Sequence, residues 1–167
     1  YTDQPPVIDG NPDDACWNKV KETEGFTSIN EGNPPAKDRT FVRCLYDRHN
    51  LYISFRCEQK RSTLKAAVKE RDGSIWLDDC VELFLSPHIK TTFLQTRSPD
   101  EQYFHLIFNS AGVVFDEMGT GGGASWDGKW TVKCRVLDDQ WQAEVAIPFS
   151  TIYVQDVEPR PLTAWKV

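Results

Sequence analysis

The stretch from Arg71 to Leu85 (RDGSIWLDDCVELFL) concentrates residue types that could bind a ligand. An Asp-Gly turn leads to Trp76, and the carboxylates of Asp79 and Glu82 follow three and six residues later. An indole can stack on the apolar C–H face of a pyranose, while carboxylates accept hydrogen bonds from paired hydroxyls. The spacing therefore favours sugar recognition, although a lone tryptophan in a β-protein more often belongs to the core.

The strand expected at 80–86 (CVELFLS), which ends at Pro87, would position the second of these carboxylates. Side chains alternate between the two faces of a strand. Glu82 should therefore point away from the apolar face that carries Val81 and Leu83.

Alternating runs elsewhere in the chain predict three hairpins, at 41–47 with 51–58, 103–109 with 113–116, and 129–137 with 141–148. Helical periodicity is weak, so only single turns are expected, near 13–20, where Asp13 or Asp14 could cap, and at 149–152. The pattern predicts an all-β antiparallel sandwich with few short helical turns. The run 162–167 is an expected last strand that is cut short.

Length and charge restrict the class of protein. The 167 residues predict one domain, spanning 1–167, and the net charge of −6 comes without any block of Lys or Arg. Nucleic acid is therefore not an expected partner, because phosphate binding relies on cationic side chains. No run approaches the ~18 apolar residues of a membrane span, so membrane insertion is not expected either.

Cysteine and histidine spacing predicts neither a zinc site nor a disulfide framework. The five cysteines include no C-x-x-C pair, and the three histidines are scattered. Most of the thiols are expected to be buried as small hydrophobic groups.

Five stretches stand in the order found in family 9 carbohydrate-binding modules, and from about residue 7 to 167 the chain resembles that family. They are Val7–Gly10 with Asp13–Trp17, Leu45–Asp47 with Leu51–Ile53, Trp76 with Asp78–Phe84, Tyr103–Asn109 with Gly112, and Trp141 with Glu144–Pro148. The resemblance implies a sandwich of DOMON-like or immunoglobulin-like topology that binds xylan or cellulose. It also implies a secreted, extracellular or periplasmic setting beside a glycoside hydrolase that degrades polysaccharide.

The resemblance also implies a set of sugar-binding residues. In members of the family two tryptophans clamp the sugar. Trp76 matches one of them, and Glu82 matches a sugar-bonding glutamate, while Asp79 matches an aspartate that orients the loop or bonds the ligand. The second clamp tryptophan lies beyond the region equivalent to Val167, so Trp126 is the candidate within this chain. Tyr103 is a further platform candidate, whereas Trp17, Trp130, Trp141 and Trp165 are expected in the core.

Some relatives bind calcium, which implies a possible structural calcium ion in this chain. Carboxylates and carbonyls would supply its oxygen ligands. The candidate carboxylates are those of Asp78, Asp79, Asp100, Glu101 and Asp116.

Three other functions remain open at this stage. Hydrolysis of a glycosidic bond would need two carboxylates across a cleft, which Asp79, Glu82, Glu101 and Asp116 could provide. Haem binding, as in cytochrome domains of the DOMON-like group, could use Met118 with His105. A structural or protein-docking sandwich would differ from a sugar-binding one in having Trp76 buried.

Overall fold

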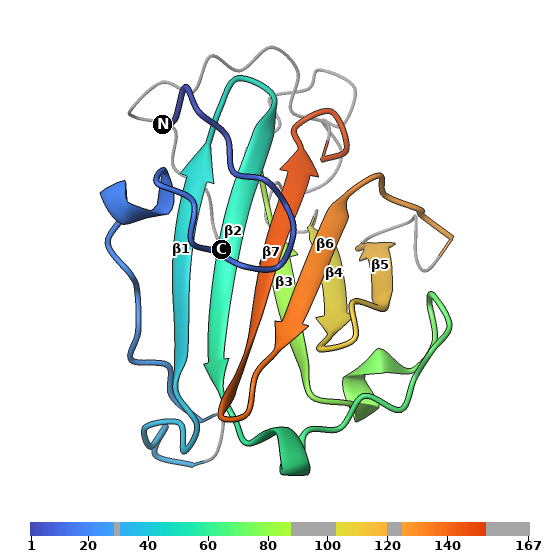
Figure 1. The fold of residues 1–167 in the computed structure, drawn as a ribbon. Coiled ribbons are helices and arrows are strands. Elements are labelled where there is room, and N and C mark those ends of the chain that lie inside the picture. The colour runs from blue at the N-terminus through green and yellow to red at the C-terminus, as the bar shows by residue number, and fades with distance from the viewer. Residues whose placement is uncertain (29–30, 88–102, 120–124, 153–167) are drawn as a thin grey trace.

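The computed structural model of the chain describes residues 1–28, 31–87, 103–119 and 125–152. Two antiparallel sheets lie face to face, with four strands in front and three behind in Figure 1. The helices of the described residues are single 3-10 turns, and none is long and apolar enough to cross a membrane. This architecture confirms the predicted all-β sandwich.

The front sheet is built from two hairpins that pair through their inner strands. The first hairpin turns at Asp47, whose carboxylate accepts hydrogen bonds from the backbone N–H groups of His49 and Asn50, both at 2.7 Å. Such a side chain fixes the turn and with it the strand register. In spatial order the strands are β1 (Thr40–Tyr46), β2 (Asn50–Glu58), β7 (Gln140–Pro148) and β6 (Thr131–Val136).

The back sheet contains the other predicted hairpin and the strand that carries Glu82. Its order is β3 (Cys80–Leu85), β4 (Phe104–Asn109) and β5 (Val114–Met118). Strands β4 and β5 turn through the positive-φ residue Gly112. All three predicted hairpins and the predicted strand at 80–86 are therefore confirmed.

The core fills the space between the two sheets with the inward-facing side chains of both. Phe108 on β4 contacts Phe55 on β2 and Trp141 on β7, with ring centroids 5.7 and 6.1 Å apart in edge-on geometry. Trp141 is thus a core residue, as predicted. The remaining buried residues of this cluster are Ile53, Cys57, Leu83, Leu85, Phe104, Leu106, Ala143, Val145, Ile147, Phe149 and Ile152.

The N-terminal segment crosses the outer side of the front sheet (Figure 1) and is anchored on Glu144 of β7. This fully buried carboxylate accepts hydrogen bonds from the indole N–H of Trp17 at 2.9 Å and from the backbone N–H groups of Asp9 and Gly10 at 3.1 and 3.0 Å. Burial raises the pKa of the Glu144 carboxyl, and the three donors oppose that rise. Two of the family-like stretches, far apart in the sequence, therefore meet at one carboxylate.

The predicted capping of the first helical turn is wrong. Helix η1 (Trp17–Lys19) begins after Cys16 without a side-chain cap. Asp14 instead accepts a hydrogen bond from the backbone N–H of Val7 at 2.9 Å, and Asp13 accepts one from Asn11. Both carboxylates therefore hold the preceding loop rather than the helix. The second predicted turn is confirmed by hydrogen bonds within 148–152.

All five cysteines are free thiols. Burial raises the pKa of Cys57 and Cys80 to about 11, and that of Cys134 to about 12. Cys16 is also buried, whereas Cys44 is exposed. The prediction of mostly buried thiols holds in part: Cys57 is buried, while Cys80 and Cys134 are partly buried. The raised pKa values make these thiols weak nucleophiles at neutral pH. The expected last strand at 162–167 and Trp165 lie outside the described residues.

Candidate functional site

Trp76 lies in η3 (Ile75–Leu77), the single turn that leads into β3. Its neighbour Ile75 is fully buried against Ile107 and Phe115, which anchors the turn to the back sheet. The indole itself is 52% exposed and stands edge-on to the ring of Phe115, with centroids 5.7 Å apart at 87°. Phe115 therefore supports one side of the Trp76 indole, and the rest of the ring is open to solvent.

The two carboxylates after this turn face inward to the chain segment at 65–68. Asp78 accepts hydrogen bonds from the N–H groups of Ala67 and Val68, both at 2.9 Å. Asp79 accepts them from the N–H of Lys65 at 2.6 Å and the amide of Gln59 at 2.9 Å. Both carboxylates hold the loop that carries Trp76, and this geometry favours the loop-orienting role of Asp79 over direct contact with a ligand.

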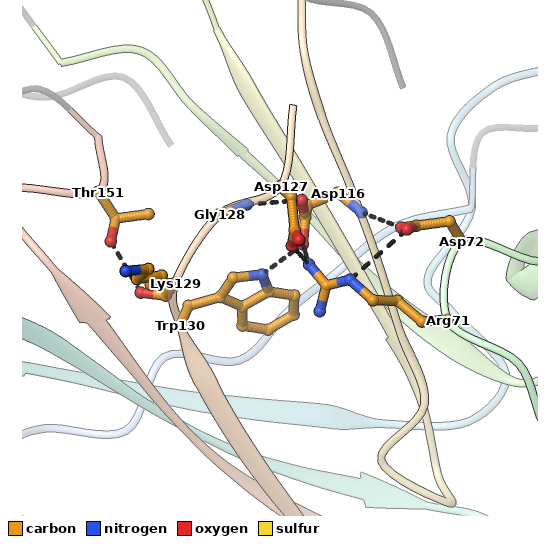
Figure 2. A network of polar contacts seen from close by, with 8 residues as sticks. All are labelled: Arg71, Asp72, Asp116, Asp127, Gly128, Lys129, Trp130 and Thr151. Carbon is orange, nitrogen blue, oxygen red and sulfur yellow. Dashed lines mark hydrogen bonds and ion pairs between the residues drawn. The ribbon is translucent and has the colours of Figure 1, made fainter. Parts of the chain in front are cut away.

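An ion pair between a partly exposed arginine and a buried carboxylate fixes the start of the same loop (Figure 2). The Asp116 side chain on β5 is fully buried and lies 2.5 Å from the Arg71 guanidinium. It also accepts hydrogen bonds from the backbone N–H of Gly128 at 2.9 Å and the indole N–H of Trp130 at 2.8 Å. Because a buried charge needs such partners, Asp116 ties the turn before Trp76 to the segment that enters β6.

Arg71 bridges further groups around this carboxylate. Its guanidinium also contacts Asp127 and lies 3.5 Å from Asp72 (Figure 2). The backbone of Asp72 is left-handed, with φ of 59°, and its N–H donates to the carbonyl of Val114 at 3.0 Å. The Asp-Gly turn predicted from the sequence is thereby locked against β5.

The outer face of the back sheet, meaning the face turned away from the front sheet, extends this platform. Leu83 and Leu85 of β3 point into the core, so the residues between them point outward. The Glu82 side chain is 39% exposed on this face, as its strand position predicted. The outward positions that follow in the sheet are Phe84, His105, Ile107, Phe115 and Glu117.

His105 on β4 lies between two glutamates of this outer face. Its Nε2 is 2.9 Å from an oxygen of Glu82, and its Nδ1 is 3.0 Å from an oxygen of Glu117. The protonated ring can donate to both glutamates at once and hold them in place, whereas the neutral ring, with one N–H, can donate to only one of them. Each carboxylate has a second oxygen through which it could accept a further hydrogen bond.

A row of aromatic rings continues from Trp76 across the outer face. Phe115 is 6.2 Å from His105, and His105 stacks on Phe84 with centroids 4.1 Å apart at 14°. Phe84 in turn lies 5.8 Å from Tyr103. Phe84 is 49% exposed although it is a large apolar residue. Exposed rings beside oriented carboxylates form a surface suited to a ligand with both apolar faces and hydroxyl groups.

Residues 8–161 match the family model described as "Carbohydrate family 9 binding domain-like". The chain belongs to this family. The match confirms the resemblance inferred from the five sequence stretches and, with it, carbohydrate binding as the role of the domain. No curated protein matches the chain.

Solved structures share the fold of this family 9 domain. A carbohydrate-binding module family 9 from Caldicellulosiruptor kristjanssonii was solved with cellotriose (TM-score 0.58, 21% identity, 87% of this chain) and with glucose (0.59, 20%, 95%). A candidate carbohydrate-binding protein from Bacteroides uniformis has a TM-score of 0.62 at 18% identity over 84% of this chain. The matches span 64, 68 and 65% of those chains, respectively.

The family 9 domain brings together three of the five predicted site residues. Trp76, Glu82 and Tyr103 share the outer face, while Asp79 lies in the loop below it. Trp126 does not join them, because its ring packs against inward-facing Phe104 at 5.1 Å and joins the core cluster. The structure therefore does not support Trp126 as a partner of Trp76.

Sequence reasoning missed Phe84, Phe115 and Glu117. Phe115 and Glu117 occupy alternate positions of β5, and Phe84 alternates with the buried leucines of β3. Alternation gave the signal for the outward side of each strand. It did not show that these outward positions meet, because that depends on the register between the strands.

The family 9 domain does not join Met118 and His105 as haem ligands. Cross-strand register pairs His105 with Glu117, and Met118 packs on the core side of the sheet. The two side chains thus point to opposite faces, so this pair cannot bind one iron. Likewise, the exposed indole of Trp76 is the opposite of what the docking alternative predicted.

The calcium candidates do not form a cation site in the described part of the chain. Asp78 and Asp79 face N–H donors, and Asp116 faces a guanidinium and two N–H groups. No cluster of three or more His, Cys, Asp or Glu side chains with metal-binding geometry occurs among the described residues. Asp100 and Glu101 lie outside these residues.

Proposed function

We propose that this domain binds oligo- or polysaccharide chains on the outer face of the back sheet, with Trp76 as the stacking platform and Glu82 as a hydroxyl acceptor. The observation that carries the proposal is the exposed indole of Trp76, which is anchored on Phe115 beside a carboxylate oriented by His105. Asp79 keeps the supporting loop in place.

The chemistry of this arrangement matches a sugar and requires no catalysis. The indole offers a flat apolar surface to the C–H groups of a pyranose. Glu82 shares one oxygen with His105, so its second oxygen can accept a hydroxyl hydrogen bond without rearranging the side chain. A preoriented acceptor reduces the conformational entropy lost on binding.

The family and its structural neighbours support a proposal for the ligand class. The C. kristjanssonii modules hold cellotriose and glucose, which supports β-linked glucose or xylose chains, as in cellulose and xylan, as the ligands proposed for this domain. Such polymers lie outside the cytoplasm. We propose an extracellular or periplasmic setting for the domain, beside a glycoside hydrolase that degrades the polymer.

Titration calorimetry with glucose, cellotriose, xylose and xylotriose tests this proposal. Trp76→Ala should weaken binding at least about tenfold, a change of ~1.4 kcal/mol. The matched control is Leu77→Ala, which removes an adjacent exposed apolar side chain and should leave affinity unchanged. Thermal unfolding should show that both variants keep the fold. Equal affinity in Trp76→Ala and wild type would refute the site.

A further inference from the structure

The outer face repeats the combination of an exposed ring and a carboxylate. One cross-strand row contains Glu82, Ile107 and Phe115, with Trp76 packed on the last of these. The next outward row contains Phe84, His105 and Glu117. Residues two apart in antiparallel strands are separated by about 7 Å. The spacing between the two rows is therefore comparable with the length of one pyranose residue.

The second row has the same physical features as the first. Phe84 is 49% exposed, against 52% for Trp76, and the Glu117 side chain is 30% exposed, against 39% for Glu82. His105 connects the rows, because one ring nitrogen binds Glu82 and the other binds Glu117. The two carboxylates are thus held in a fixed relation to each other.

Phe84 is placed so that one side of its ring can take a ligand. His105 covers one side by stacking at 4.1 Å. The other side lies toward the edge of the described back sheet, because β3 has β4 as its only neighbour in that sheet. Tyr103 lies 5.8 Å from Phe84 and lengthens the aromatic row.

We infer that Phe84, Tyr103 and Glu117 form a second sugar subsite, next to the Trp76 subsite, so that the domain binds at least two linked pyranose units at once. This inference rests on the proposed function. The Phe84 ring takes the apolar face of the second sugar, and the second oxygen of Glu117 accepts one of its hydroxyls. His105 fixes the spacing between the two acceptors.

The acidic side chains of the outer face favour neutral sugars over anionic ones. The outward positions of β3, β4 and β5 that line the two rows include two glutamates and one histidine but no lysine or arginine. Uronic acids and sulfated sugars would place their anionic groups close to these carboxylates, and like charges repel. A neutral oligosaccharide has no such penalty.

The test compares affinities for glucose, cellobiose and cellotriose, and for xylose, xylobiose and xylotriose, by calorimetry. Wild type should bind the disaccharide at least about tenfold more tightly than the monosaccharide, or ~1.4 kcal/mol. Phe84→Ala should abolish this gain, so that the disaccharide and the monosaccharide bind with similar affinity. Glu117→Gln should reduce the gain severalfold, and Phe84→Tyr, which retains the ring, should preserve it.

The outcomes separate the inference from the proposed function. If wild type binds these sugars but Phe84→Ala keeps the full disaccharide gain, the second subsite is refuted and the Trp76 site stands. If wild type binds neither series, the proposed function fails and the second subsite fails with it. Thermal unfolding of each variant checks the fold, and the exposure of Phe84 predicts little loss of stability.

Discussion

Two acidic side chains that lie close together in the sequence have different roles in this domain. Asp78 accepts hydrogen bonds from two backbone N–H groups and from the amide of Asn109 at 3.1 Å, so its oxygens serve the loop. Glu82, four residues later, extends from a strand and bonds to His105 on the surface. That both residues are acidic does not distinguish these roles, because the role depends on how many hydrogen-bond donors surround each carboxylate.

Asp78→Asn tests the structural role at the residue scale. Desolvation alone would raise the pKa of Asp78, but the donors outweigh it and hold the pKa below the ordinary 3.8. A depressed pKa stabilises the folded state above pH 3.8, and that contribution is lost as pH falls through the folded-state pKa. Asp78→Asn should therefore lower the thermal midpoint at pH 6, with a difference that shrinks at acidic pH.

Circular dichroism melts from pH 2 to pH 7 measure this difference. Asp3→Asn is the matched control, because the side chain is exposed and the described residues supply it with no hydrogen bond. It should change the midpoint little at any pH. A difference for Asp78→Asn that is constant with pH would show that the carboxylate charge is not what stabilises the loop.

At the scale of secondary structure, the strands could be predicted because apolar and polar residues alternate along the sequence, so that the two faces of each strand differ in polarity. In β3 the sequence CVELFL places Glu82 outward and Leu83 and Leu85 inward, as found. Phe84 could not be assigned in this way, because an apolar type at an outward position looks like a core residue until its partner is known. The stacked partner, His105, lies in a different strand, β4.

Elements without periodicity were less predictable. The turn η3 that orients Trp76 is one turn long, and its position depends on burial of Ile75 by residues of β4 and β5. Trp126 lies in a segment without alternation, so its sequence could not reveal that it packs on Phe104. The local pattern thus indicated the exposed tryptophan but not its supports.

Arg71→Ala tests how the loop depends on the ion pair between Arg71 and the buried carboxylate of Asp116. Removing one partner of a buried pair leaves an uncompensated charge, which typically costs ~3–5 kcal/mol. Arg71 is partly exposed, so solvent already screens its side of the pair, and Asp116 keeps the N–H donors of Gly128 and Trp130. We therefore expect a lower value of about 1–3 kcal/mol here. Because the turn before Trp76 loosens, sugar affinity should also fall.

Chemical denaturation measures the loss in free energy of unfolding, and calorimetry measures the affinity. The control is Arg39→Ala, which removes an ion pair with Glu24 in which both side chains are mostly exposed. Such exposed pairs contribute about 0–1 kcal/mol to the free energy of unfolding. Arg39 directly precedes β1 of the front sheet, away from the site. Equal stability of Arg71→Ala and wild type would contradict the role assigned to Asp116.

At the scale of the whole molecule, the two faces of the sandwich have separate tasks. The outer face of the back sheet carries the exposed rings, whereas the N-terminal segment covers part of the front sheet through Glu144 (Figure 1). The core lies between them. This separation predicts that changes at Glu144 alter stability without changing the sugar site.

Glu144→Gln is the variant that tests this separation. One glutamate oxygen accepts from Trp17 and the other from the N–H groups of Asp9 and Gly10. A glutamine has a single acceptor oxygen, and its NH2 group would face a donor, so at least one buried N–H loses its partner. An unsatisfied buried polar group costs about 1–3 kcal/mol, and the thermal midpoint should fall accordingly.

Affinity measured well below that midpoint should equal that of wild type, and Glu24→Gln, at an exposed carboxylate, should change neither quantity. A Glu144→Gln variant that folds but binds sugar more weakly would show that the N-terminal segment is coupled to the outer face across the core.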